Sequence, residues 1–271
     1  MITVSGIGPI RATPLSILGS ALLFADYWAA DRNNVAAVNP RITITGAGVS
    51  DWPEEATRNV ALTQGTDANR PVLSATSFGG RPGVTLDGSN DGLFCTMSPS
   101  MAIGSRLYIW LVAHWTTTSI GKDYARSVEI SRETAGVADA AVAIISATDA
   151  GNLFGGFGNL SDGDDDAAGV AANGQAISTT RGVWEYGLLA TTTGKFVQSG
   201  TATDGTFTGT LKTGTHAKLS LGCRHQTTGA ELLEAPVCVH RLVIAHNPAD
   251  ITALPTSAQL TAMRAYLSGF L

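Results

Sequence analysis

Short apolar segments separated by glycine, aspartate, asparagine and threonine recur along most of the 271-residue chain. The segment 106–115 is the clearest, because its odd and even positions both carry apolar side chains, as in a central strand with two covered faces. Further segments with strand patterning are 126–131, 140–147, 152–158, 183–191, 195–199, 217–223 and 236–245. Their spacing, with turn residues between them, favours two packed antiparallel sheets over βαβ units.

A turn at 87–92 separates two short strand segments, 84–86 and 93–97. This arrangement predicts a β-hairpin. The turn begins like a calcium loop, but its twelfth position is Ser98 rather than glutamate. A turn held by Asx-type hydrogen bonds is therefore the favoured interpretation.

A short helix is predicted at the C-terminal end of the sequence, beginning after Thr256. Thr256 and Gln259 have the spacing of a capping box, and Leu260, Met263 and Leu267 follow at helical intervals. A single apolar stripe predicts that this helix docks on the sandwich.

Residues 1–14 are predicted to form an arm ahead of one domain, 15–271, because no linker, repeat or change of composition divides the remainder. Thr13-Pro14 is suited to opening a helical turn. Ile2 and Val4 alternate with polar residues as a strand would, and an added strand satisfies its amides at a sheet edge. That edge belongs either to a neighbouring subunit or to the arm's own sandwich.

Composition and charge argue against two classes of partner, nucleic acid and membrane. The net charge is −5, and no cluster of Lys and Arg is present to neutralise phosphates, which argues against nucleic acid. The longest apolar stretch, 15–30, is interrupted by polar residues and falls short of the ~20 residues that span a membrane. Three cysteines, Cys95, Cys223 and Cys238, predict buried thiols and a reducing cytoplasm, although the last two could also face each other.

A series of short motifs carries a resemblance. In chain order they are Asp51-Trp52, Arg58-Asn59, Leu62-Thr63-Gln64, Ala68-Asn69-Arg70-Pro71, Gly80-Arg81-Pro82 and the segment 86–93. This order resembles concanavalin A-like lectin/glucanase domains of the laminin-G type, many of which occur in bacteriophage structural proteins and bacterial surface proteins. Arg58-Asn59 stands where the family has a longer Gly/Asn-rich motif. The resemblance implies an all-β, two-sheet antiparallel jelly-roll sandwich with a short C-terminal helix. That fold hosts lectins, hydrolases and interaction modules, so function must be argued from sites.

Asp162, Asp164 and Asp166 form the sharpest run of charge and are the candidate metal ligands. Carboxylates at alternate positions suit a hard cation, and the resemblance implies calcium as that cation. The alternative is a solvated acidic loop tip.

Trp115 is the candidate ligand-binding aromatic. Of five tryptophans, Trp28 and Trp52 fall within the family pattern and are expected in the core, whereas Trp110 and Trp115 lie on opposite faces of one strand. Aromatic anchors favour binding surfaces.

No catalytic motif is found in the sequence. Retaining glucanases of this fold place two carboxylates ~5.5 Å apart on a Glu-x-Asp-x-x-Glu strand. That spacing is absent, and Glu129 and Glu133 would lie ~13 Å apart along a strand. The sequence therefore predicts a protein that is not an enzyme.

The leading hypothesis is a non-enzymatic virion surface protein of a tailed phage or phage-derived particle, assembled in the host cytoplasm. Such a module would serve in decoration, as a fibre or in receptor binding, attach to other subunits or virion proteins through residues 1–14, and bind host surface polysaccharide. One alternative is a carbohydrate-binding module of a bacterial surface protein. A second alternative is a glycoside hydrolase.

Calcium at Asp162, Asp164 and Asp166 would make the melting temperature sensitive to chelator. A ligand bound only by the folded state adds RT ln(1 + [L]/Kd), about 2.7 kcal/mol at a hundredfold excess over Kd. Calorimetry with calcium and with chelator should show that difference, and replacing all three aspartates by asparagine should abolish it. An identical transition under both conditions would rule out a tight site.

Overall fold

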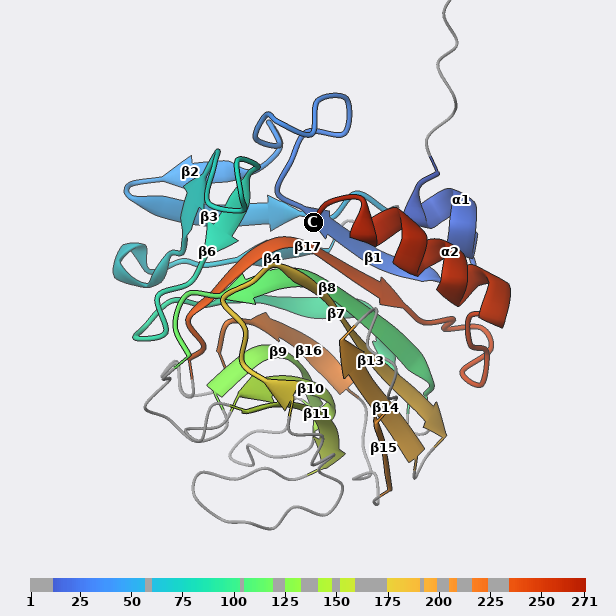
Figure 1. Cartoon of the computed structure of the whole chain (residues 1–271). Helices are drawn as coiled ribbons and strands as arrows, with labels where there is room; N and C mark the ends of the chain where they lie inside the picture. Colours follow the sequence, from blue (N-terminus) through green and yellow to red (C-terminus); the bar gives the residue numbers. More distant parts are fainter. Residues whose placement is uncertain are drawn as a thin grey trace, which may run out of the picture.

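Two antiparallel sheets pack face to face in the computed structural model, and two helices cover the outer side of one of them (Figure 1). The structure describes residues 12–56, 60–102, 105–118, 125–132, 141–147, 152–158, 175–190, 193–198, 205–208, 216–223 and 234–271. The predicted all-β sandwich with a short C-terminal helix is confirmed.

The sheet beneath the helices is called here the helix-covered sheet. Its strand order is β15-β14-β13-β8-β17-β6-β5, and β1 also pairs with β17. The strands are β1 (Leu23–Trp28), β5 (Val72–Ser74), β6 (Gly83–Thr85), β8 (Leu107–Trp115), β13 (Gly182–Ala190), β14 (Thr193–Gln198), β15 (Gly205–Thr208) and β17 (Val237–Ala245).

The second sheet has the order β12-β11-β10-β9-β16-β7-β4-β3-β2. Its strands are β2 (Thr43–Thr45), β3 (Gly48–Pro53), β4 (Ala61–Thr63), β7 (Leu93–Met101), β9 (Ala125–Arg132), β10 (Ala141–Ala147), β11 (Asn152–Gly158), β12 (Gln175–Ala176) and β16 (His216–Leu221). A 3-10 turn, η1 (Asp67–Asn69), lies between β4 and β5.

Strand β8 explains why the core has two parts. Its odd positions, from Leu107 to Trp115, join the core between the two sheets, whereas Tyr108, Trp110 and Val112 join a separate cluster under the helices. Both faces of β8 are buried, as the sequence predicts for 106–115. The helix-covered sheet therefore needs the helices, because they remove its second apolar face from water.

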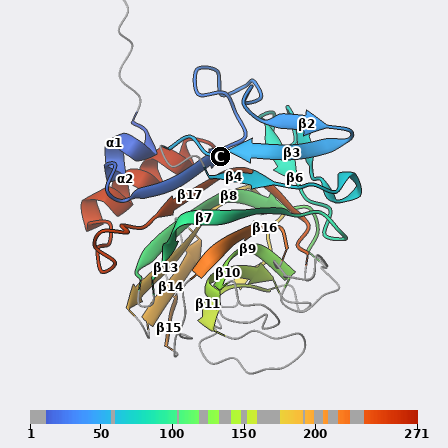
Figure 2. The ribbon, with the colours of Figure 1, turned by 180° about the vertical axis from the view of Figure 1, so that it is seen from behind.

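The helices α1 (Pro14–Leu18) and α2 (Ser257–Ser268) each begin with a capping box, at Thr13 and at Thr256. Met263 and Leu267 of α2 are buried, which confirms the docked helix. The two helices lie side by side (Figure 2), and the Gln259 amide nitrogen donates to the carbonyl oxygens of residues 17 and 18 at the end of α1. Of the predicted arm, residues 1–11 lie outside the described residues, and Pro14 belongs to α1.

The predicted hairpin at 84–97 is wrong. Strand β6 lies in the helix-covered sheet and β7 lies in the second sheet, so the 87–92 turn crosses from one sheet to the other. The turn itself has the expected Asx bonds, because Asp87 Oδ1 accepts from the Ser89 amide. Its far end is bonded to η1, where the Gly92 amide donates to the Asn69 carbonyl. These bonds direct the chain away from β6.

The three cysteines are free and buried, which confirms the predicted thiols. No helix among the described residues is both long and apolar enough to cross a membrane.

Candidate functional site

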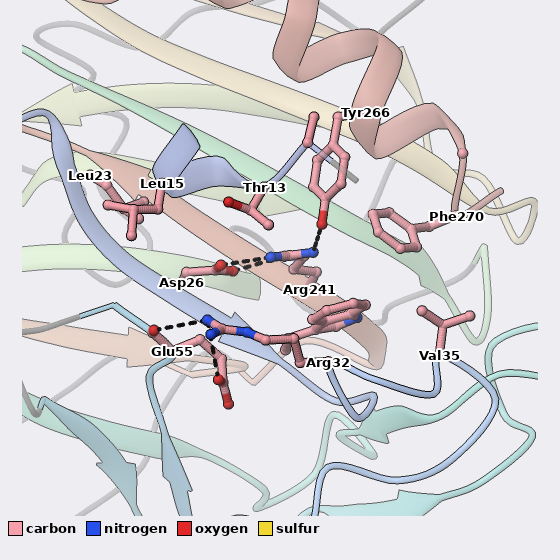
Figure 3. Close-up of a pocket in the computed structure, with 13 residues that line it drawn as sticks. Thr13, Leu15, Leu23, Asp26, Arg32, Val35, Glu55, Arg241, Tyr266 and Phe270 are labelled. Atoms are coloured by element: carbon pink, nitrogen blue, oxygen red, sulfur yellow. Dashed lines mark hydrogen bonds and ion pairs between the residues drawn. The ribbon is translucent and has the colours of Figure 1, made fainter. Parts of the chain in front are cut away.

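A pocket of about 380 Å³ opens beside the outer face of the helix-covered sheet (Figure 3). It lies where the start of α1, the end of α2 and the loop after β1 meet. The lining residues are Ala12, Thr13, Leu15, Leu23, Asp26, Trp28, Arg32, Val35, Glu55, Arg241, Tyr266, Gly269 and Phe270. This volume is within the ~300–1,000 Å³ range of small-molecule sites.

A buried ion pair forms the centre of the pocket wall. Arg241 donates from Nε to Asp26 Oδ1 at 2.8 Å and from Nη2 to Oδ2 at 2.6 Å. The side chains of Arg241 and Asp26 are 2% and 4% exposed. Strand register brings them together, because β1 pairs with β17 so that Asp26 lies opposite Val243 and Trp28 lies opposite Arg241. Two parallel hydrogen bonds offset part of the cost of burying both charges.

Two aromatic side chains complete the surroundings of the Arg241 guanidinium. Its Nη1 donates to the Tyr266 hydroxyl at 2.6 Å, and its carbon lies 4.1 Å from the centre of the Trp28 ring. Burial lowers the pKa of Arg241, but the Asp26 carboxylate outweighs it, so the net shift is upward. Arg241 therefore stays charged and connects β17, β1 and α2.

His240 contacts the edge of the Trp28 ring. The Trp28 indole donates to His240 Nε2 at 3.2 Å, and His240 Nδ1 lies 2.6 Å from the Pro82 carbonyl oxygen. Because indole only donates, Nε2 must accept, so Nδ1 carries the proton and the imidazole is neutral. Burial lowers the pKa of His240 to about 4, against a partial opposing effect of the Pro82 carbonyl.

Arg32 and Glu55 line the outer part of the pocket. Arg32 is 58% exposed, and its Nη2 lies 3.4 Å from the Glu55 carbonyl oxygen and 3.7 Å from Glu55 Oε2. The Glu55 side chain is 10% exposed, and its Oε1 also accepts from Asn39 and pairs with Arg41 at 3.2 Å. The pocket thus combines aromatic walls with charged hydrogen-bonding groups at its mouth.

The expectation that Trp115 faces a ligand is wrong. Its side chain is fully buried between the sheets, where Nε1 donates to Ser127 Oγ at 3.1 Å and the ring packs edge-on against Trp184. The strand bearing it is covered on both faces, so neither Trp110 nor Trp115 is available to a ligand.

The candidate metal ligands Asp162, Asp164 and Asp166 lie outside the described residues. Within the described part of the chain, no group of three or more His, Cys, Asp or Glu side chains is arranged to hold a metal ion.

The pocket residues were missed at the sequence level, although a signal was present. Asp26 and Arg241 are single charges inside strongly apolar segments, 22–30 and 237–245. A lone charge on a buried strand requires a partner, because an unpaired buried charge is expensive. Matching the two isolated charges would have paired β1 with β17.

No protein-family model and no curated protein sequence matches this chain. Among solved structures, the chain is similar to an arabinofuranosidase complexed with arabinofuranosyl-alpha-1,2-xylobiose (10% identity, TM-score 0.59, covering 96% of this chain and 65% of that one). It is also similar to Trypanosoma rangeli sialidase in complex with 2,3-difluorosialic acid (14% identity, TM-score 0.52, covering 91% of this chain and 33% of that one). A third similar structure is the binding domain of Paraclostridial Mosquitocidal Protein 1 (9% identity, TM-score 0.50, covering 89% of this chain and 52% of that one). At these identities the similarity shows the fold, and the chain spans only 33% to 65% of those structures.

Replacing Asp26 by Asn should destabilise the protein by about 3–5 kcal/mol, because Arg241 is left as an uncompensated buried charge. Urea unfolding measures the loss. Asp67→Asn is the matched control: Asp67 also pairs with an arginine but is 63% exposed, so about 0–1 kcal/mol is expected there. The double variant Asp26→Leu with Arg241→Met should recover much of the loss. Equal stability of Asp26→Asn and the unaltered protein would contradict the role of the pair.

Stability should also depend on His240 in mildly acid solution. Its folded pKa of about 4 is below the ordinary 6.5, so the unfolded chain binds more protons between these values. The stabilisation is complete above pH ~6.5 and falls as the pH is lowered towards 4, by on the order of 3 kcal/mol. His240→Asn keeps a donor without this titration. The stability difference between the two proteins should shrink from pH 7 to pH 4, and parallel profiles would count against this assignment.

Proposed function

We propose that this protein is a non-enzymatic carbohydrate-binding β-sandwich and that the pocket of Figure 3 receives a sugar ring. The observation that carries the proposal is the combination of aromatic walls, Trp28, Tyr266 and Phe270, with the exposed guanidinium of Arg32 at the mouth.

This combination matches the chemistry of a sugar. The carbon-bound hydrogens of a pyranose ring form apolar faces that pack on aromatic rings, and its hydroxyls pair with charged planar side chains. Arg32 retains unused donors, because its contacts to Glu55 lie at 3.4 and 3.7 Å.

The ion pairs of the pocket carboxylates support binding rather than catalysis. Both carboxylates of the pocket are already paired with arginines: Asp26 with Arg241, and Glu55 with Arg41 and Arg32. Carboxylate oxygens that are already engaged by arginines are less available to a substrate. Two of the similar structures are named as an arabinofuranosidase in complex with an arabinofuranosyl xylobiose and as a sialidase. These two names favour a carbohydrate ligand, and because both proteins are enzymes they leave a glycosidase as the second candidate.

The biological setting that we propose is a particle or cell surface. The laminin-G-type motifs between Asp51 and Leu93 resemble both phage structural proteins and bacterial surface proteins, and we place a phage virion surface module first because residues 1–14 offer an arm for attachment. Deleting residues 2–12 tests the attachment: the sandwich should still fold while association with the particle is lost. Unfolding of the truncated protein would instead assign the arm to its own sandwich.

Glycan binding should depend on Arg32. A glycan array of bacterial surface polysaccharides identifies the ligand, and calorimetry measures its affinity. Arg32→Gln should weaken binding about tenfold or more, because a charge-assisted hydrogen bond contributes roughly 1.5–3 kcal/mol.

Arg41→Gln is the matched control for this measurement. Arg41 is 51% exposed and pairs with the same glutamate, but it does not line the pocket, so affinity should stay unchanged. Absence of glycan binding, or equal losses in both variants, would contradict the proposed site. Release of reducing sugar from a bound polysaccharide would favour the glycosidase.

A further inference from the structure

Two half-buried arginines beyond the pocket, Arg81 and Arg181, have no carboxylate partner in the part of the chain that the structure describes. Arg81 donates to the Gly269 carbonyl oxygen at 3.1 Å and lies 5.8 Å from the Phe270 ring centre. Arg181 lies 5.8 Å from the centre of the Phe78 ring. A guanidinium that rests on an aromatic face keeps its in-plane N–H groups free for an anion.

Other enclosed arginines of this structure are neutralised. Arg126 pairs with Glu129, Arg241 with Asp26, and Arg264 with Glu185. Removing a cation from water without a counterion is costly. Arg81 and Arg181 lack such a carboxylate among the described residues, as the half-buried Arg106 also does, and they differ from Arg106 in lying beside the same turn.

The turn 78–81 carries Arg81, and the Arg181 guanidinium lies against its Gly79. Phe78 and Arg81 exchange both backbone hydrogen bonds, and Gly79 and Gly80 have positive φ of 61° and 84°. A Cβ on Gly79 would overlap the Arg181 guanidinium, so only glycine allows this approach. A Cβ on Gly80 would meet no atom within 4 Å, so open space lies beside the turn.

Burial and the positive charge of these arginines lower the pKa of the two histidines next to the turn. The Phe78 ring stacks on His240, at 5.0 Å, and on His114, at 5.6 Å. Burial lowers the pKa of both imidazoles, and Arg181 lowers it further in each case, joined at His240 by Arg241 and Arg81. His114 Nδ1 is buried and has no hydrogen-bond partner. The region therefore carries positive charge and an unused polar atom.

We propose that Arg81 and Arg181 form an anion subsite that binds the acidic group of a saccharide, a carboxylate or a sulfate ester. The subsite adjoins the sugar pocket, because Arg81 contacts Phe270 and Gly269, which both line that pocket. The saccharide part rests on the proposed function. The ligand class is thus an acidic polysaccharide, with a neutral ring face in the pocket and a charge at the turn.

Calorimetry with trigalacturonate and with its methyl ester, at constant ionic strength, tests the subsite. The acid should bind at least tenfold more tightly than the ester, and Arg181→Gln and Arg81→Gln should each remove most of that preference. Arg181→Gln is the cleaner variant, because Arg81 also caps the end of α2. Arg106→Gln removes the same charge at the opposite end of β8, where Arg106 bonds to Thr252, and should leave the preference intact.

The outcomes separate the two proposals. Equal binding of acid and ester, with both weakened by Arg32→Gln, overturns the subsite and leaves the sugar pocket standing. Binding of free glucuronate that depends on Arg181, with Arg32→Gln without effect on any glycan, supports the anion subsite and contradicts the proposed pocket. Binding of the acid that is unchanged in Arg181→Gln and Arg81→Gln overturns the subsite, as does failure of both trigalacturonate and glucuronate to bind.

Discussion

The ion pair between Asp26 and Arg241 determines how the helix-covered side of this protein is assembled. Neither charge is accessible to water, so each requires the other. Their pairing fixes the register of β1 on β17, because a shift of one residue would turn Asp26 into the apolar core between the sheets. The same guanidinium holds Tyr266 and faces Trp28, so the position of α2 and the shape of the pocket follow from it.

Much of the architecture could be predicted because the residues of a strand or helix themselves carry the pattern that identifies it. The alternation of 106–115 identified a strand covered on both faces, and Thr256 with Gln259 identified the start of α2. Strand partners are not local information. The segments 84–86 and 93–97 looked like a hairpin, yet they lie in different sheets, because Leu86 bonds to Val237 while Gly92 bonds to Asn69.

The candidate site was missed because its residues are distant in the sequence. Asp26 and Arg241 are separated by 215 positions in the sequence, and their meeting depends on β1 pairing with the last strand. Trp115 was chosen as an aromatic residue on one face of a strand, whereas its burial follows from the second sheet, where Ser127 of β9 accepts from its indole. Aromatic residues that do line the pocket, Tyr266 and Phe270, reach it only because α2 folds back across the sheet. The type of a residue makes it a candidate for a site, but strand pairing between distant segments determines which candidates come into contact.

The hydrogen bonds between α1 and α2 also determine when the helix-covered face can fold during synthesis. Strand β1 has its pairing partner in β17, and α1 is held by Gln259 of α2, so residues 14–28 depend on segments that are made later. A nascent chain that lacks residues 237–268 has no surface on which residues 14–28 can settle. Contacts this distant in sequence slow the folding of a domain. The helix-covered face therefore forms only after residues 237–268 have left the ribosome, and until then the apolar strand β1 is exposed to aggregation.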